Sequence, residues 1–370
     1  MKEKYCLAIV YEQLDKDGRA LRQISTLIKG NYRVIVICAN TSSKFNNARC
    51  KVINFDTGRK LKGWLKFNLL TLKYIWRHRK EIYFLYMLNS YMLLLGFISK
   101  KYLNINWVYD SYENLIISKK FPFTLMEKYI FLLEKFCVKN SFLVVAANSE
   151  RARLMKHLYR LSNVTYVMNI IHKNQVVDTA SKPLPNAGED FWILYQGVIT
   201  KERNLSLIIS SLQYLPLNYK LRIIGSGDEE NLKILIEKMG LCDRVVFEGR
   251  LPYNEMLKKS LNSHLGIVYY ISWNLNTYYC SPNKIFEYAN MHIPIISSSQ
   301  QLFRKIFSKY KIGAFLEENA TPEKVAKIIE EISLNYDTYT KDFCAFNEEY
   351  SSENESYRLL EKMKETLEKK

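Results

Sequence analysis

The sequence predicts an α/β fold with two doubly wound parallel sheets, one in each half of the chain. Three observations lead to this prediction. The chain has 370 residues, which is enough for two domains. Short β-branched runs alternate with helical patterns along the chain, as is typical of parallel sheets covered by helices. A polar stretch with two prolines and a glycine, residues 173–190, separates the halves and predicts an interdomain linker.

The first half, residues 1–172, is expected to form one Rossmann-like domain. Its strands are predicted at Tyr5–Tyr11, Arg33–Cys38, Lys51–Phe55, Ile82–Tyr86, Ile105–Tyr109, Phe142–Ala146 and Asn163–Met168. Helical patterns fall between most of them, at about 18–29, 61–79, 90–100, 121–139 and 148–160. The apolar residues 82–99 contain Asn89-Ser90 at their centre. They are therefore expected to form a strand, a turn and a buried helix, not a membrane span of ~20 apolar residues.

The charge of the chain is concentrated in the first half. The net charge is +17, of which residues 1–172 carry +18 (29 basic, 11 acidic) and residues 173–370 carry −1 (25 basic, 26 acidic). This asymmetry predicts that one domain meets an anionic partner, either nucleic acid or an acidic membrane leaflet. Seven cysteines without a CxxC pair favour a reducing, cytoplasmic setting and argue against a zinc site.

The predicted helix at 61–79 has a basic stripe beside an apolar one. Four basic residues fall within about 60° on a helical wheel: Lys62, Lys66, Lys73 and Arg77. An apolar stripe runs beside them: Leu65, Leu69, Leu72 and Trp76. This pattern fits a helix lying on a membrane surface. It also fits a core helix with a solvated lysine edge.

Two loops of the first half carry polar residues where an active site of this fold would recruit them. Gly18 and Arg19 follow the first strand, and Gly18 permits close approach of a ligand. Asp110, Tyr112 and Glu113 follow the strand that ends at Tyr109, and their side chains could bind hydroxyl groups. A capped loop explains the second group equally well. Asp15 and Asp17 spell DxD, which we interpret as chance, not as a metal site.

The second half, residues 191–335, repeats the alternation. Its strands are predicted at Trp192–Gln196, Lys220–Ile224, Val245–Phe247, Leu265–Tyr270 and Ile293–Ser297, and helices at 204–214, 229–239, 254–262 and 322–334. Four loops follow these strands and carry glycine or cationic residues. They contain Gly197 with Lys201 and Arg203, Gly225 with Gly227, Gly249 with Arg250, and Ser281 to Glu287. Their coincidence at one sheet edge predicts a binding site for a phosphorylated ligand.

The stretch from Ser281 to Glu287 is central to this site. Ser281 is predicted to cap a helix with Pro282 in its first turn. The backbone N–H groups of such a helix start suit a phosphate, and Lys284 there opposes the helix dipole unless an anion is bound. Glu287 could accept hydrogen bonds from sugar hydroxyls. The alternative is a solvated lysine and a surface glutamate on an ordinary helix.

Pro282-Asn283-Lys284-Ile285-Phe286-Glu287, followed by Pro294-Ile295-Ile296, resembles the nucleotide-sugar motif of retaining glycosyltransferases of family 4, which have the GT-B fold. The resemblance implies two Rossmann-like domains and a C-terminal helical segment, residues 336–370, that crosses back to the first. It implies that Glu287 binds the donor ribose and that Arg203 grips the diphosphate. The sequence departs from the family at Val198 and Tyr279, where an arginine and a glutamate are usual, and in having one glycine, Gly18, in its first loop.

We therefore expect a metal-independent, retaining, hexosyltransferase-type enzyme without a cofactor. Its donor would be a nucleotide diphosphate sugar and its acceptor a saccharide or lipid-linked saccharide. The expected setting is bacterial surface polysaccharide synthesis on the inner face of the membrane, with peripheral attachment to an anionic surface and no nucleic acid partner. A nucleotide-sugar epimerase of the same fold and a non-enzymatic nucleotide- or nucleic-acid-binding protein are the alternatives.

The resemblance implies the following site residues. Arg203 and Lys284 are the expected catalytic groups. The expected donor-binding residues are Gly197, Lys201, Arg203, Gly225, Arg250, Ser281, Pro282, Asn283, Lys284 and Glu287. The expected acceptor-side residues are Gly18, Arg19, Asp110, Tyr112 and Glu113.

Overall fold

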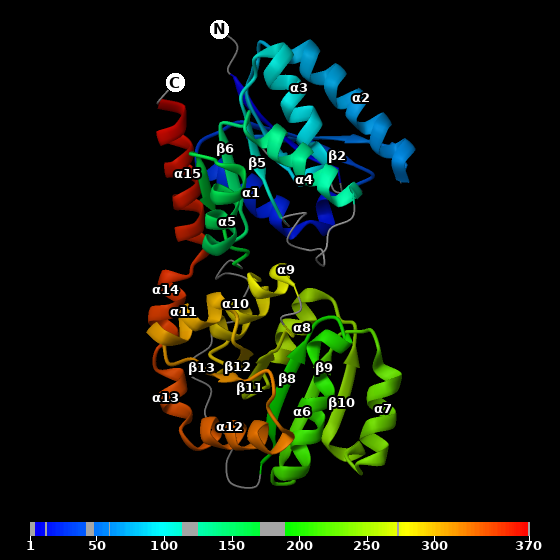
Figure 1. The fold of residues 1–370 in the computed structure, drawn as a ribbon, viewed down its shortest axis with the longest axis vertical. Helices are drawn as coiled ribbons and strands as arrows, with labels where there is room; N and C mark the ends of the chain where they lie inside the picture. Colours follow the sequence, from blue (N-terminus) through cyan, green and yellow to red (C-terminus); the bar gives the residue numbers. More distant parts are fainter. Residues whose placement is uncertain are drawn as a thin grey trace. The chain divides into compact units, whose positions relative to one another are not determined.

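The computed structural model describes residues 4–11, 13–41, 48–58, 60–112, 125–170, 189–271 and 274–368. The chain divides into two compact units (Figure 1). Unit 1 consists of Met1–Asn169 and Glu355–Lys370, and unit 2 of Ile170–Asn354. Most of the predicted linker, and Glu113, lie outside the described residues.

Unit 1 contains a parallel sheet with strand order β3-β2-β1-β4-β5-β6-β7. The strands are β1 (Tyr5–Val10), β2 (Val34–Ala39), β3 (Cys50–Phe55), β4 (Ile82–Leu88), β5 (Trp107–Asp110), β6 (Leu143–Ala146) and β7 (Val164–Tyr166). The order reverses between β1 and β4, as in doubly wound dinucleotide-binding folds. All seven strands match predicted ones.

Alternate residues of β1 face opposite helix layers, which is why the strand is an unbroken apolar run. Leu7 and Ile9 pack with α2 (Lys60–His78), α3 (Leu93–Leu103), α4 (Leu125–Val138) and α5 (Ser149–Tyr159). Cys6 and Ala8 pack with α1 (Gly18–Lys29) and α15 (Ser352–Glu368). The sheet of unit 1 is thus buried on both faces.

Asn89 and Ser90 interrupt the apolar segment 82–99, as predicted. Asn89 has φ 78°, and its side chain accepts a hydrogen bond from the Ser90 N–H. The short 3₁₀ helix η2 (Ser90–Met92) links β4 to α3. Across the part of the chain that the structure describes, no helix is long and apolar enough to cross a membrane.

Unit 2 contains a parallel sheet with strand order β10-β9-β8-β11-β12-β13. The strands are β8 (Phe191–Gln196), β9 (Tyr219–Ile224), β10 (Val245–Gly249), β11 (Leu265–Val268), β12 (Ile295–Ser298) and β13 (Gly313–Leu316). The order again reverses beside the first strand, here between β8 and β11. Loops after β8 and β11 therefore diverge and leave the crevice where doubly wound sheets bind ligands. Strand β13 was not predicted.

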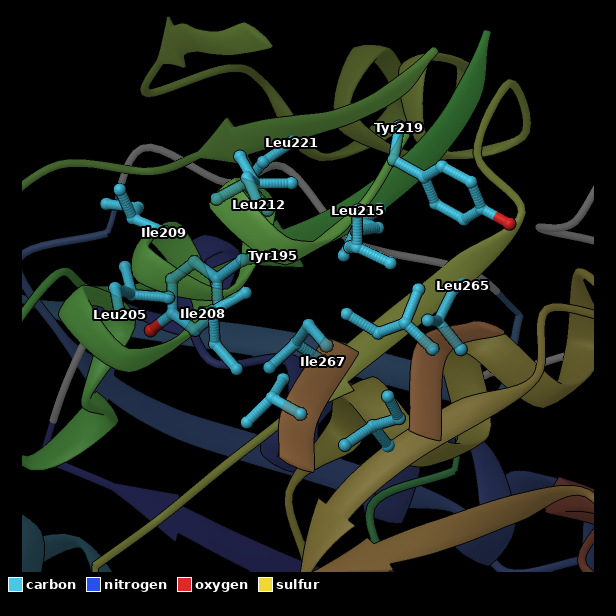
Figure 2. Packing of buried hydrophobic residues seen from close by; sticks show 14 of the residues in the cluster. Tyr195, Leu205, Ile208, Ile209, Leu212, Leu215, Tyr219, Leu221, Leu265 and Ile267 are labelled. Carbon is cyan, nitrogen blue, oxygen red and sulfur yellow. The ribbon is translucent and has the colours of Figure 1, made fainter. Parts of the chain in front are cut away.

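Helices cover both faces of this sheet. They are α6 (Leu205–Ser211), α7 (Glu229–Lys238), α8 (Tyr253–Ser260), α9 (Leu275–Tyr278), α10 (Asn283–Asn290), α11 (Gln301–Lys309), α12 (Pro322–Leu334), α13 (Tyr336–Thr340) and α14 (Phe343–Glu349). Figure 2 shows part of the core, where Tyr195 of β8 packs against Leu205 and Ile208 of α6. This packing holds the end of β8, and the loop after it, against the start of α6.

Helix α15 carries the chain back into unit 1. The Glu355 carboxylate accepts a hydrogen bond from the Met168 N–H at 2.6 Å, and the hydroxyls of Thr26 and Ser356 lie 2.9 Å apart. Leu359 and Met363 are buried against the sheet. Only Glu355–Lys370 joins unit 1. The return therefore begins later than residue 336, because α13 and α14 pack within unit 2 through Tyr339 and Phe346.

Candidate functional site

Two glycine loops meet at the carboxyl ends of β8 and β9. A side chain at Gly225 would place its Cβ 1.8 Å from the Gly197 carbonyl oxygen, and one at Gly227 would lie 2.1 Å from that of Ile199. Both glycines have positive φ, 151° and 153°, which other residues rarely adopt. The predicted donor-binding residue Gly225 therefore lets the Gly197 loop approach.

Helix α10 begins beside these loops, one residue later than predicted. Pro282 is the N-cap, and its side chain cannot cap the helix. The Ser281 hydroxyl precedes the cap, so the prediction that it caps α10 is wrong. Its oxygen is buried and has no hydrogen-bond partner among the described residues. The first turn, from Asn283, thus presents backbone N–H groups and no capping side chain, as an anion site requires.

Lys284 extends from the first turn of α10 over the Gly197 backbone. A Cβ at Gly197 would lie 3.0 Å from the lysine Nζ. The Nζ lies 4.2 Å from the ring centre of Tyr195 and 5.5 Å from that of Tyr270. Burial, and then the charge of Arg203, lower the pKa of Lys284 to about 7, while Glu287 and Cys280 oppose the shift.

Arg203 contacts the same tyrosine, Tyr270, as Lys284 does. It ends the 3₁₀ helix η4 (Lys201–Arg203), and its Cζ lies 3.8 Å from the ring centre of Tyr270. Tyr270 follows β11, across the switch point from Gly197. Two cations that repel each other are therefore held together by aromatic faces. A bound anion would offset the repulsion between Lys284 and Arg203, so these two side chains form a site suited to a negatively charged ligand.

Glu287 lies one turn further along α10 and is buried. Its carboxylate accepts hydrogen bonds from the Gln196 amide and, at 3.1 Å, from the Tyr253 hydroxyl. The side-chain amide oxygen of Gln196 in turn accepts a hydrogen bond from the Ser260 hydroxyl at 3.0 Å. These hydrogen bonds orient the Glu287 carboxylate, and a carboxylate oxygen can accept more than one hydrogen bond. A surface glutamate, the alternative interpretation, does not fit this burial.

Sequence reasoning missed four side chains of this site: Tyr195, Gln196, Tyr253 and Tyr270. Tyr195 and Gln196 end β8, and Tyr270 follows β11. Their position at the ends of predicted strands is the sequence signal that could have identified them. The side chains of strand-end residues in a doubly wound sheet face the crevice or support it. Tyr253 begins α8 and could not be predicted, because only the fold brings it to Glu287.

The two remaining donor-side candidates are exposed. Lys201 lines a cavity of about 330 Å³ with Thr200, Asp228 and Asn231. Arg250 lies in the turn directly after β10. Both follow strands of the same sheet edge as Gly197.

Arg19 and Asp110, two of the expected acceptor-side residues, bind each other in the core of unit 1. The Asp110 carboxylate is fully buried, and it accepts hydrogen bonds from Arg19 at 2.9 Å, Gln23 at 2.8 Å and Tyr86 at 2.9 Å. Arg19 also donates to the Val167 carbonyl oxygen at 2.8 Å. These two residues link α1 to the carboxyl ends of β5 and β7 and serve the core of unit 1.

Asp17 and Tyr112 form a second polar contact in unit 1. The Tyr112 hydroxyl donates to the Asp17 carboxylate at 2.8 Å, and that carboxylate also caps α1 through the Ala20 N–H. The capped-loop interpretation therefore fits the described part of this loop. Gly18 is exposed at the first position of α1. The Asp17 carboxylate thus links α1 to the loop after β5.

The two sheets and the helices around them form the GT-B fold. Residues 176–342 match the family model "Glycosyl transferases group 1". The predicted resemblance to group 1 glycosyltransferases is thereby confirmed, and the match covers the four loops of the site in unit 2.

Solved structures of the same fold cover almost the entire chain. Sucrose-phosphate synthase from Thermosynechococcus elongatus superposes with a TM-score of 0.72 at 12% identity, covering 99% of this chain and 100% of that one. Anabaena HepE in complex with UDP superposes with a TM-score of 0.71 at 13% identity, over 98% and 100%. WaaG, a glycosyltransferase involved in lipopolysaccharide biosynthesis, reaches 0.63 at 12% identity, over 95% and 94%. No curated protein sequence matches the chain.

Proposed function

We propose that this chain is a retaining glycosyltransferase that moves a sugar from a nucleotide diphosphate sugar to a saccharide or lipid-linked saccharide. The observation that carries the proposal is the pair of cations, Lys284 and Arg203, beside the start of α10 and one turn from the buried Glu287. This arrangement matches a donor in charge and in polarity. The diphosphate would meet the cations and the helix start, and the ribose hydroxyls would meet Glu287.

The chemistry follows from the same geometry. When the bond between the sugar C1 and the β-phosphate oxygen breaks, negative charge develops on the departing diphosphate. Lys284, Arg203 and the backbone N–H groups of α10 stabilise that charge. The acceptor oxygen bonds to C1 on the face that the diphosphate leaves, and its proton passes to the leaving phosphate. HepE, solved with UDP and with UDP-glucose, supports this class of donor.

Glu287→Ala is expected to weaken UDP binding about 100-fold, because hydrogen bonds to a charged group contribute about 1.5–3 kcal/mol each and the ribose offers two hydroxyls. Isothermal titration calorimetry with UDP measures this loss. Glu287→Gln keeps the shape of the side chain and should lose less affinity, while Glu237→Ala, on the exposed side of α7, is the matched control. Unchanged UDP binding in Glu287→Ala would remove the residue from the donor site.

We propose that no metal takes part, since Lys284 and Arg203 already supply two positive charges. Sugar transfer is therefore expected to survive treatment with EDTA at full rate. The rate should be compared before chelation, after it, and after addition of Mn²⁺. Complete loss with recovery on Mn²⁺ would contradict metal-independent transfer. It would also make Asp15 and Asp17 candidate metal ligands.

The proposed setting is synthesis of a bacterial surface polysaccharide at an anionic membrane surface, with the enzyme bound peripherally on its cytoplasmic side. WaaG supports the polysaccharide setting. The excess charge of the first half, +18 over residues 1–172, supports the membrane surface, because a basic segment gains about 1 kcal/mol per Lys or Arg near an anionic leaflet. A lipid-linked acceptor would be presented at such a surface.

A further inference from the structure

The apolar stripe of α2 faces away from the core. The buried face of the helix consists of Phe67, Thr71 and Ile75. In the predicted stripe beside the lysines, Leu65 is 48% exposed, Leu69 69% and Trp76 57%, whereas Leu72 is partly buried against the core. Leu61, one turn before Leu65, is 68% exposed. Packing of α2 on the core therefore accounts for Phe67, Ile75 and Leu72 but not for the exposed leucines and Trp76. Leucines at this spacing on a solvent face need a partner.

Helix α3 extends the apolar face of α2. The two helices pack side by side within unit 1 (Figure 1). A groove of about 410 Å³ lies between them, lined by Leu69, Leu72 and Trp76 of α2 and by Ile98 and Tyr102 of α3. Tyr102 is 70% exposed at its mouth. We call this set, with Leu61 and Leu65, the α2–α3 surface.

The charged side chains of α2 and α3 themselves have one sign. Helix α2 carries five basic residues and α3 carries two, and neither contains Asp or Glu. Lys73 belongs to the wall of the groove itself. The guanidinium of Arg79 lies 5.1 Å from the ring centre of Trp76. The exposed apolar residues of α2 are thus flanked by basic residues of the same helix. Helices that lie in the interface of a bilayer have this pattern.

This combination discriminates between possible occupants. Nucleic acid would match the charge, but its phosphates would leave the leucines and the groove in water. A second copy of the chain in a two-fold dimer would set one basic α2 against another, which costs energy. An anionic bilayer satisfies both features, because its headgroups meet the lysines and its acyl chains meet the leucines.

We propose that the α2–α3 surface inserts into the interface of an anionic bilayer, with a lipid acyl chain in the groove and the lipid phosphate on Lys73. The inference deepens the peripheral attachment proposed above and rests on it. Its new content is that attachment is specific and apolar as well as electrostatic. Leu69 and Trp76 enter the acyl region, while Lys62, Lys66 and Arg77 stay at the headgroups.

The test uses the full chain and sedimentation with phosphatidylcholine vesicles, with and without phosphatidylglycerol. Wild type should bind only the anionic vesicles and be released by high salt. Leu69→Glu and Trp76→Ala should each weaken binding about tenfold, the effect of keeping one large apolar side chain in water. Leu334→Glu, at a position 84% exposed on α12, is the matched control and should bind as wild type does. Charge reversal to Glu at Lys62, Lys66, Lys73 and Arg77 should abolish binding.

A second measurement tests the groove. Lipids brominated on their acyl chains should quench the tryptophan fluorescence of wild type more than that of Trp76→Phe. Equal quenching in the two proteins would overturn insertion of Trp76. Anionic binding that charge reversal abolishes but Leu69→Glu and Trp76→Ala leave intact would refute the apolar contact and keep the electrostatic one.

The donor site is checked separately. UDP calorimetry on the α2 variants should give wild-type affinity, because these changes lie in unit 1 and the donor residues lie in unit 2. Failure of vesicle binding with normal UDP binding would refute the surface alone. Preference of the wild type for duplex DNA over anionic vesicles at equal salt would overturn the choice of partner.

Discussion

Lys284→Ala and Arg203→Ala are each expected to lower turnover by about 100-fold or more, because loss of one group that stabilises charge in the transition state costs about 3 kcal/mol. Lys284 lies against the Gly197 backbone and the rings of Tyr195 and Tyr270, Arg203 lies over the ring of Tyr270, and neither belongs to the hydrophobic core of unit 2. Folding should therefore be little affected. Release of nucleoside diphosphate from the donor at saturation measures the effect, with Lys258→Ala, an exposed lysine of α8, as the control.

The pH dependence of UDP binding distinguishes Lys284 from Arg203. Burial and the neighbouring arginine lower the pKa of Lys284 to about 7, and an anion binds the protonated form. Affinity should therefore fall as pH rises above 7, by up to about tenfold per pH unit. Lys284→Arg keeps its charge at every accessible pH and should flatten this dependence. Near-normal turnover in both alanine variants would take both residues out of the site, and an unchanged pH profile in Lys284→Arg would take out Lys284 alone.

Asp110→Ala is expected to destabilise unit 1 by about 3–5 kcal/mol, because it leaves the buried Arg19 guanidinium without its counter-charge. Urea denaturation followed by circular dichroism measures the loss, and each unit should be fitted separately since a two-unit chain need not unfold in one step. UDP affinity, a property of unit 2, should be unchanged.

The double variant Arg19→Met with Asp110→Leu provides the control for this prediction. It removes both charges, so it should recover much of the stability that Asp110→Ala loses. If Asp110→Ala were as stable as wild type but failed to transfer sugar, Asp110 would contact the acceptor after all. The original assignment of this residue would then be restored.

The fold could be predicted because its signals are local and repeat. Buried parallel strands appear as short β-branched runs, and the helices between them have apolar residues at helical spacing. Every strand of unit 1 was found in this way. In unit 2, β13 and α11 escaped prediction, because Gly313–Leu316 is too short to stand out against the surrounding apolar helices.

The candidate site could be predicted in part, for the same reason. Gly197, Arg203, Lys284 and Glu287 lie in loops that follow predicted strands, and the carboxyl ends of parallel strands meet at one edge. The partners of these residues are distant in sequence. Tyr270 lies 67 positions after Arg203, and Tyr253 lies 34 before Glu287, so no local pattern connects them.

The sequence by itself determined the order of strands and helices, the edge of the sheet where the donor loops gather, and the position of the excess positive charge. These properties follow from short-range periodicity and composition. Only the tertiary structure decided which side chains are buried. It placed Asp110 in the core of unit 1 although its loop position predicted exposure. It also left Leu61, Leu65 and Leu69 of α2 in solvent, because Phe67 and Ile75 already fill the side of the helix that faces the sheet. Burial depends on neighbours brought from distant parts of the chain, and those neighbours are known only once the chain has folded.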